Sequence, residues 1–160
     1  MRISTQWILK PVLLISAFVL TAGAMAASLQ EVVSLMEQRQ YPQAEPLLRE
    51  ALAAGEDAEA HYLLGFLLIE TYRYPEAEQH LQAAVRTRPD QDHWLMVLAK
   101  SQLEQGKNLA AENTLLSAIA LKPEPSYYHA HAMTAFNTGN LALAESSLRA
   151  CLDLESTHQD

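Results

Sequence analysis

The chain has 160 residues, of which 19 are acidic and 11 are basic, so its formal net charge at pH 7 is −8. An acidic surface repels nucleic acid and anionic lipid, and the charge therefore argues against both as partners. The only cysteine is Cys151, which excludes an intramolecular disulfide bond and is expected to be a small buried residue.

The first 26 residues differ in composition from the rest of the chain. Arg2 and Lys10 are their only charged side chains, and an apolar run, PVLLISAFVLTAG, leads to Ala24-Met25-Ala26. A basic start, a short apolar stretch and an A-x-A exit are typical of a secretory signal peptide. We predict that residues 1–26 are this signal peptide, that it is cleaved near Ala26, and that the protein is bacterial and periplasmic or secreted.

The alternative is an uncleaved segment that anchors the protein N-terminally in the inner membrane, facing the periplasm. An apolar run of about 17 residues lies at the short limit for a membrane span, and no stop-transfer flank follows it. Cleavage would leave 134 of the 160 residues, with nine basic and 19 acidic side chains and a net charge of −10. We therefore expect no membrane contact after cleavage.

Beyond this segment, the dipeptide Ala-Glu returns four times. Its alanines are residues 44, 77, 111 and 144, at steps of 33, 34 and 33 residues. A leucine follows each alanine after four positions, and small and apolar residues follow after seven and eight. These offsets mark one face of an α-helix, so each unit carries the same amphipathic helix. A period of 33–34 residues with one such helix per unit indicates a stacked helical array.

Each unit also shares a fixed order of large, small and helix-ending residues with its neighbours. In the second unit these are Leu64, Gly65, Leu68, Tyr74, Ala77, Leu81, Ala84 and Pro89. This order closely resembles the tetratricopeptide repeat. The third and fourth units repeat it, whereas the first is less regular because Glu31 replaces a large apolar residue. The resemblance covers residues 28–155.

The resemblance implies an all-α fold, a right-handed superhelical solenoid of antiparallel helix pairs. The domain is expected over residues 27–155, with a tail over residues 156–160. Its four repeats are expected over residues 28–56, 58–90, 92–124 and 125–156. The eight helices are expected near residues 28–39, 42–54, 58–71, 75–87, 91–104, 108–121, 125–138 and 141–155.

Glycine and proline provide local signals along the array. Gly55, Gly106 and Gly139 follow predicted helices, where a left-handed backbone conformation favours glycine. Pro46 falls inside the second predicted helix, where it should remove a hydrogen bond or delay the start of the helix.

In tetratricopeptide domains, the first helices of the repeats line a concave wall that usually binds an extended peptide or a partner helix. Carried over to this chain, the wall is apolar and contains methionine, which suits adaptable contact with hydrophobic segments. The expected groove residues are Tyr62, Phe66 and Ile69 from the second repeat, His93, Met96 and Lys100 from the third, and His129, Met133 and Phe136 from the fourth. The competing interpretation is that Tyr62 and Phe66 only fill the packing between repeats.

We therefore predict a non-catalytic interaction module, an adaptor or assembly factor that binds a peptide or protein partner outside the cytoplasm. The alternative is a structural oligomer or scaffold subunit of an envelope complex that acts through its uncapped C-terminal end. Leu148, Leu152 and Leu154 are expected to be partly uncovered there, and a homo-oligomer would assemble through this last helix. The carboxylate clamp known in the family is absent, since Lys100 is the only basic residue among the lining positions.

No arrangement of residues favours catalysis, a cofactor or a metal site. His129 and His131 lie two positions apart and point to different faces of a helix, and His93 with His129 lacks a third ligand. The glutamate of each Ala-Glu pair recurs in every unit, which indicates solvated side chains near the positive ends of helix dipoles. We expect neither enzyme activity nor a cofactor.

Overall fold

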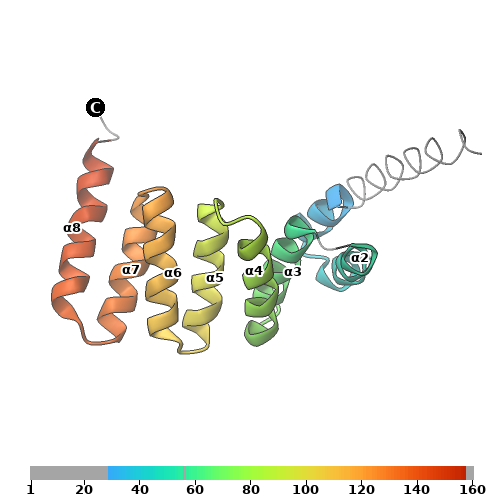
Figure 1. The fold of residues 1–160 in the computed structure, drawn as a ribbon, viewed down its shortest axis with the longest axis horizontal. Helices are drawn as coiled ribbons and strands as arrows, with labels where there is room; N and C mark the ends of the chain where they lie inside the picture. Colours follow the sequence, from blue (N-terminus) through green and yellow to red (C-terminus); the bar gives the residue numbers. More distant parts are fainter. Residues whose placement is uncertain (1–28, 56, 158–160) are drawn as a thin grey trace, which may run out of the picture. The chain divides into compact units, whose positions relative to one another are not determined.

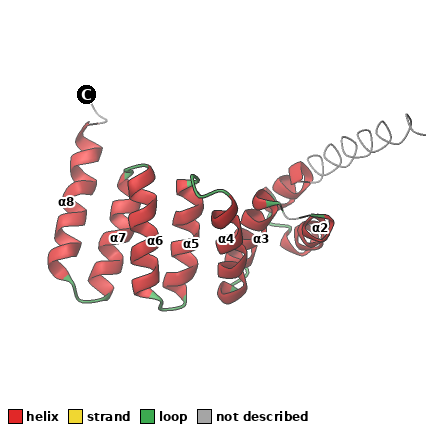
Figure 2. Ribbon diagram, viewed as in Figure 1, coloured by secondary structure: helices red, strands yellow, loops and turns green. Residues whose placement is uncertain are grey.

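The computed structural model describes residues 29–55 and 57–157, and every regular element within them is an α-helix (Figure 1, Figure 2). A first helix covers residues 29–37, and seven more follow: α2 (Tyr41–Ala54), α3 (Ala58–Glu70), α4 (Tyr74–Thr87), α5 (Asp92–Glu104), α6 (Asn108–Leu121), α7 (Pro125–Asn137) and α8 (Leu141–Thr157). These boundaries agree with the expected ones to within two residues. The predicted signal peptide lies outside the described residues, and none of the described helices is long and apolar enough to cross a membrane.

The chain divides into two compact units, one ending at Gly55 and one beginning at Glu56. The division falls between the first and second predicted repeats. In the first unit, the helix over residues 29–37 precedes α2, whose buried residues are Ala44, Leu48 and Ala51. Pro46 lies inside α2 without delaying its start, because the helix begins at Tyr41.

In the second unit, α3 to α8 lie side by side in chain order, and each helix contacts the next (Figure 1). The helices form three hairpins, α3 with α4, α5 with α6, and α7 with α8. The repeated residues of the second helices are fully buried between these layers: Ala77, Leu81 and Ala84 in α4, and Ala111, Leu115 and Ala118 in α6. Helix α8 extends to Thr157, and the rest of the tail expected over residues 156–160 lies outside the described residues.

Small residues set how closely the two helices of a hairpin approach. A Cβ atom added at Gly65 of α3 would lie 2.6 Å from Cγ of Leu81 and 3.2 Å from the carbonyl oxygen of Ala77, both on α4. A side chain at this position is therefore sterically excluded unless the helices move apart. The equivalent positions in the next two hairpins hold Ala99 and Ala132, which are also buried.

The turns between helices correct one expectation about glycine. Gly106 and Gly139 have positive φ angles of 71° and 79°, as predicted, but Gly55 has φ 174° and is extended. The positions equivalent to Gly106 in the first two repeats are Arg39 and Tyr72, with φ angles of 58° and 62°. The same left-handed turn therefore recurs in all four repeats, and two of them form it without glycine.

Replacing Gly65 by alanine should lower the free energy of unfolding, because the added methyl group would overlap Leu81. Overpacking of this kind costs about 1–3 kcal/mol. Leu81→Ala should cost about 2–5 kcal/mol by leaving a cavity. Urea unfolding followed by circular dichroism measures both. Gly55→Ala is the control, since a Cβ there meets no atom within 4 Å; equal stability of the two glycine variants would contradict the close approach of α3 and α4.

Candidate partner-binding face

The nine predicted groove residues lie on α3, α5 and α7, the first helices of the three hairpins. We call the side formed by these helices the first-helix face. Its side chains become more exposed from α3 to α7: Ile69 is buried, Tyr62, Phe66 and Met96 are half-buried, and His93, Lys100, His129, Met133 and Phe136 are exposed. The predicted residues are therefore not equally available to a partner.

Aromatic side chains fill the junction between α3 and α5. The rings of Tyr62 and Trp94 are stacked, with centroids 4.9 Å apart and planes inclined by 9°. His93 meets the Tyr62 ring edge-on at 5.4 Å, and the guanidinium carbon of Arg88 lies 5.0 Å from the centroid of the Trp94 ring. Burial in this cluster raises the pKa of Tyr62. Tyr62 thus packs between repeats while remaining half-buried.

The centre of this cluster, Trp94, was not among the predicted site residues. It is 3% exposed, and the corresponding residue of α7, Tyr127, is 6% exposed. The Tyr127 hydroxyl donates a hydrogen bond of 2.6 Å to the Asp92 carboxylate, and burial and this bond raise the pKa of Tyr127. A large aromatic residue that recurs after 33 positions in the first turn of a first helix is the sequence signal that would have identified this position.

The α7 part of the face presents the most exposed apolar surface. Met133 is 47% exposed and Phe136 is 60% exposed, one turn apart on the same helix. The neighbouring charge is largely balanced, because the Lys100 ammonium lies 3.8 Å from the Glu70 carboxylate. On α7 the first-helix face therefore presents the aromatic ring of Phe136 and the thioether of Met133. The surface beside them on α5 has little net charge, because Lys100 pairs with Glu70.

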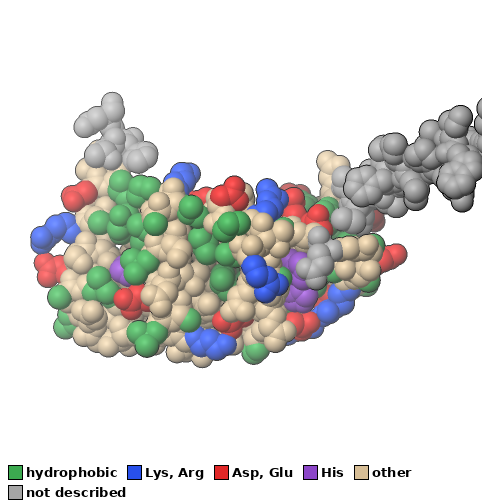
Figure 3. Space-filling view, viewed as in Figure 1, with side chains coloured by type: hydrophobic (Ala, Val, Ile, Leu, Met, Phe, Trp, Pro, Cys, Tyr) green, Lys and Arg blue, Asp and Glu red, His purple; other side chains and the backbone are tan. Residues whose placement is uncertain are grey.

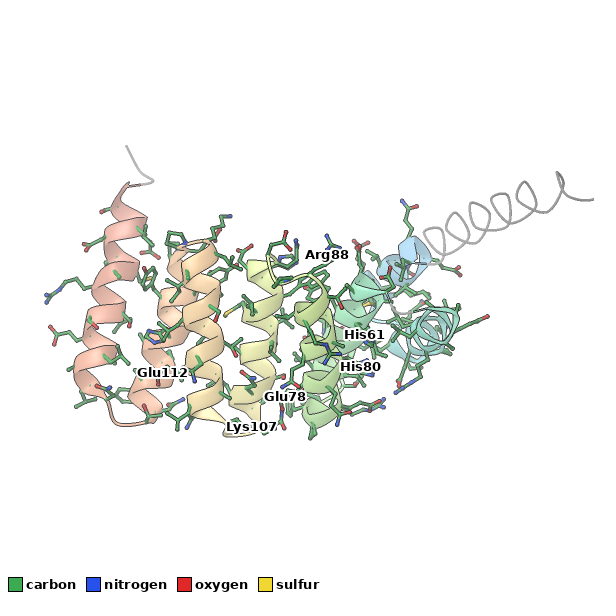
Figure 4. All side chains as sticks on the ribbon, in the orientation of Figure 1. His61, Glu78, His80, Arg88, Lys107 and Glu112 are labelled. Atoms are coloured by element: carbon green, nitrogen blue, oxygen red, sulfur yellow. The ribbon has the colours of Figure 1, made fainter. Side chains whose placement is uncertain are left out.

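Glu78 contradicts the expectation that the repeated glutamates are solvated. It is 7% exposed, and its carboxylate accepts hydrogen bonds from Gln102 at 3.4 Å, Gln105 at 2.9 Å and Lys107 at 2.6 Å (Figure 4). Burial raises the pKa of Glu78, but the three donors together outweigh burial and hold the pKa below its usual value. The carboxylate is buried because α5 and the α5–α6 connection cover this face of α4. Its counterpart on α8, Glu145, is exposed.

The described histidines lie in different surroundings. His131 is 3% exposed and lies 2.9 Å from the Ser147 hydroxyl, and burial lowers its pKa, whereas His129 is exposed. His61 of α3 and His80 of α4 form a pair that was not predicted from the sequence, with their Nδ1 atoms 2.9 Å apart (Figure 4). Two imidazoles fall short of the three or four protein ligands that zinc usually takes. No group of three or more His, Cys, Asp or Glu residues in the described part of the chain is arranged to hold a metal ion.

Comparison with known proteins identifies the repeat. Family models of the tetratricopeptide repeat match residues 35–101, 72–134 and 125–158. A crystal structure of MamA has a TM-score of 0.82 at 19% sequence identity, covering 89% of this chain and 86% of MamA. MamA residues 41 to the end from Desulfovibrio magneticus RS-1 give a TM-score of 0.81 at 17% identity, covering 85% and 78%. At such identities the likeness concerns the fold alone. No match was found among the curated proteins.

Replacing Glu78 by glutamine should destabilise the protein at neutral pH, because the ion pair with Lys107 is lost inside a largely buried network. Hydrogen bonds to charged groups contribute about 1.5–3 kcal/mol, and glutamine retains part of that. The folded-state pKa of Glu78 is lowered, so its stabilising effect is complete above the usual pKa of 4.5 and is lost as pH falls through the folded-state pKa.

The measurement is urea unfolding of the wild type and Glu78→Gln at pH 7 and at successively lower pH. The difference in stability should be largest at pH 7 and should shrink in acid below the usual pKa of 4.5. Glu145→Gln is the matched control, since Glu145 occupies the same repeat position but its side chain is 75% exposed. Equal losses for both variants at pH 7 would contradict a special role for the buried network.

Proposed function

Because the chain belongs to the tetratricopeptide repeat family, we propose that it is a non-catalytic adaptor or assembly factor that binds a peptide or partner segment along its first-helix face, outside the cytoplasm. Proteins of this fold generally act as interaction modules. The observation that carries the proposal is the exposed apolar surface of Met133 and Phe136 on α7.

Three features support this face as the binding groove. Aromatic and methionine side chains provide most of the energy in interfaces with hydrophobic segments, because they bury a large area and adapt to different partners. Met133 and Phe136 are exposed, and the half-buried Phe66 and Met96 continue the apolar surface on α3 and α5. Tyr62 and Ile69 contribute less, because their side chains are already engaged in the packing of the array.

The proposed location rests on the sequence before residue 27. Arg2 and Lys10, the apolar run and the A-x-A exit at Ala26 favour export and cleavage. The partner would then be a protein or peptide of the periplasm or the exterior, and the net charge of the chain disfavours nucleic acid.

A structural oligomer remains the second candidate function. One observation favours it: Leu148 and Leu152 of α8 are 43% and 64% exposed, at the last layer of the array. In that case the end of the solenoid, and not the first-helix face, would make the functional contact.

Truncation of Phe136 to alanine should weaken partner binding with little effect on stability, because the ring is 60% exposed. An aromatic anchor typically contributes about 2 kcal/mol or more to binding, which corresponds to a loss of affinity of about thirtyfold. The partner would first be identified by crosslinking in the native envelope, and its affinity would then be measured by calorimetry. Leu109→Ala on α6, where Leu109 is 75% exposed, is the control away from this face. Unchanged affinity in the double variant Phe66→Ala and Phe136→Ala would reject the groove.

Export with cleavage after Ala26 predicts a mature chain that begins at Ala27. The reason is that signal peptidase accepts small residues in the A-x-A arrangement formed by Ala24 and Ala26. Intact-mass measurement of the protein recovered from the cell envelope tests this directly. Replacing Ala24 by a bulky residue should block cleavage and serves as the control. A full-length chain in the membrane fraction of the wild type would instead indicate an uncleaved anchor.

A further inference from the structure

The outer face of α8 lacks the cover that the same positions have on the earlier second helices. Leu81 of α4 and Leu115 of α6 have no exposed surface, because α5 and α7 pack over them. Leu148 occupies the same repeat position on α8 and is 43% exposed, and Leu152, one turn later, is 64% exposed. Figure 3 shows hydrophobic side chains over the C-terminal half of α8, at the upper left of the view. The described residues leave both Leu148 and Leu152 partly uncovered.

The interior junctions show what normally covers this face. At both of them an aromatic side chain from the first turn of the following helix packs against a small residue of the second helix. Trp94 of α5 packs against Ala84 of α4 and stacks on Tyr62. Tyr127 of α7 packs against Ala118 of α6. Each junction therefore contains an aromatic-binding site, in which one ring from a first helix packs on a small residue of the preceding second helix.

The residues of this aromatic-binding site recur at α7 and α8, where no aromatic ring from the described residues fills it. Cys151 is the counterpart of Ala84 and Ala118, and His129 is the counterpart of Tyr62 and Met96 in the repeat register. A recess of about 620 Å³ lies here. It is lined by Met96 of α5, by residues at and just before the start of α7 (Glu124, Pro125, Ser126, His129 and Ala130), and by Cys151 and Glu155 of α8. The recess therefore lies where an aromatic side chain of a following helix would be placed.

A second group at this end lacks the partners that its counterpart has. Glu78 on α4 receives hydrogen bonds from Gln102 of α5 and from Gln105, the residue that directly follows α5. Glu145 holds the same position on α8, is 75% exposed, and pairs with Arg149 of its own helix at 3.1 Å. A helix packed on α8 in the register of α5 would bring its own donors to Glu145.

We propose that the outer face of α8 binds an amphipathic helix of a partner protein, in the position of a further first helix. The partner helix carries tryptophan or tyrosine in its first turn and amide or amine donors about eight and eleven residues later. This spacing is that of Trp94, Gln102 and Gln105. The aromatic ring fills the recess beside His129, and the donors bind Glu145. The recess borders Met96 and His129 of the first-helix face, but Met133 and Phe136 do not line it, so the inference does not depend on the function proposed for those two residues.

Charge favours a different protein over a second copy of this chain as the occupant. α8 carries three acidic residues, Glu145, Asp153 and Glu155, against one basic residue, Arg149. Pairing of two α8 helices would bring like charges together, and the whole chain has a net charge of −8. A helix with neutral amide or basic donors avoids this repulsion.

The probe is a fluorescent synthetic peptide with the sequence of residues 90–107, which contains α5 and covers the equivalent face of α4 in this chain. Fluorescence anisotropy against the purified protein should show saturable binding. Trp94→Ala in the peptide should weaken binding by about tenfold or more, because the aromatic anchor is lost. Gln105→Glu in the peptide should also weaken it by placing a carboxylate near Glu145.

The matched protein variants are Leu152→Glu and Leu116→Glu. Leu152→Glu should weaken peptide binding by about tenfold or more, since it places a charge in the apolar contact. Leu116→Glu should not, because Leu116 is a 46% exposed residue of α6 at the position of Arg149. Both substitutions are at exposed positions, and circular dichroism melting verifies that the variants fold.

Two results would overturn the proposal. The first is peptide binding that is absent up to millimolar concentration or insensitive to Trp94→Ala. The second is a dimer of the protein alone, detected by light scattering, that Leu152→Glu dissociates, because a second copy would then occupy the face. Phe136→Ala should leave peptide binding unchanged, so failure here is distinguishable from failure of the proposed function.

Discussion

The close approach of consecutive helices is the constraint on which the array depends. It requires a small residue wherever one helix axis passes over another, and the chain provides one at each such position of the described hairpins. Gly65 is the extreme case, because even a methyl group would overlap Leu81. Once the spacing is set, Leu48, Leu81 and Leu115 at the four-residue offset have no remaining contact with water. Burial of apolar surface, worth about 25 cal/mol per Å², then stabilises each of these layers. Each layer in turn provides the surface on which the next one packs.

This dependence explains how much of the fold could be predicted from sequence. The period of 33–34 residues comes from a packing requirement that repeats with every hairpin, so it is visible in a single chain. The turns were less predictable. The left-handed residue at the end of each first helix is glycine at positions 106 and 139 but Tyr72 in the second repeat, because the surrounding backbone hydrogen bonds hold the turn whichever residue is present.

The candidate site was harder to predict than the fold. Repeat position alone assigned Tyr62, Ile69 and Phe136 to the same surface, yet Ile69 is 3% exposed and Phe136 is 60% exposed. Glu78 and Glu145 show the same difference for a carboxylate. In each case the residue type and the position in the repeat are similar, and what differs is whether neighbouring helices close over the position. Whether a neighbouring helix covers a position depends on the tertiary structure, and the local sequence around these residues does not reveal it.

Position along the array therefore decides what a repeated residue does. Inside the array, Leu81 and Glu78 join two layers, one through apolar burial and the other through hydrogen bonds that fix the register of α5 on α4. A buried carboxylate is a weak source of net stability, because desolvation offsets most of its attraction to Lys107, but it strongly disfavours a shifted register in which the charge would have no donors. On α8 both effects are weaker within the described chain: Leu148 is 43% exposed, and Glu145 is 75% exposed and pairs only with Arg149 of its own helix. The apolar contact and the carboxylate that join two layers inside the array are therefore accessible on α8, which is the basis of the helix-docking site that we propose there.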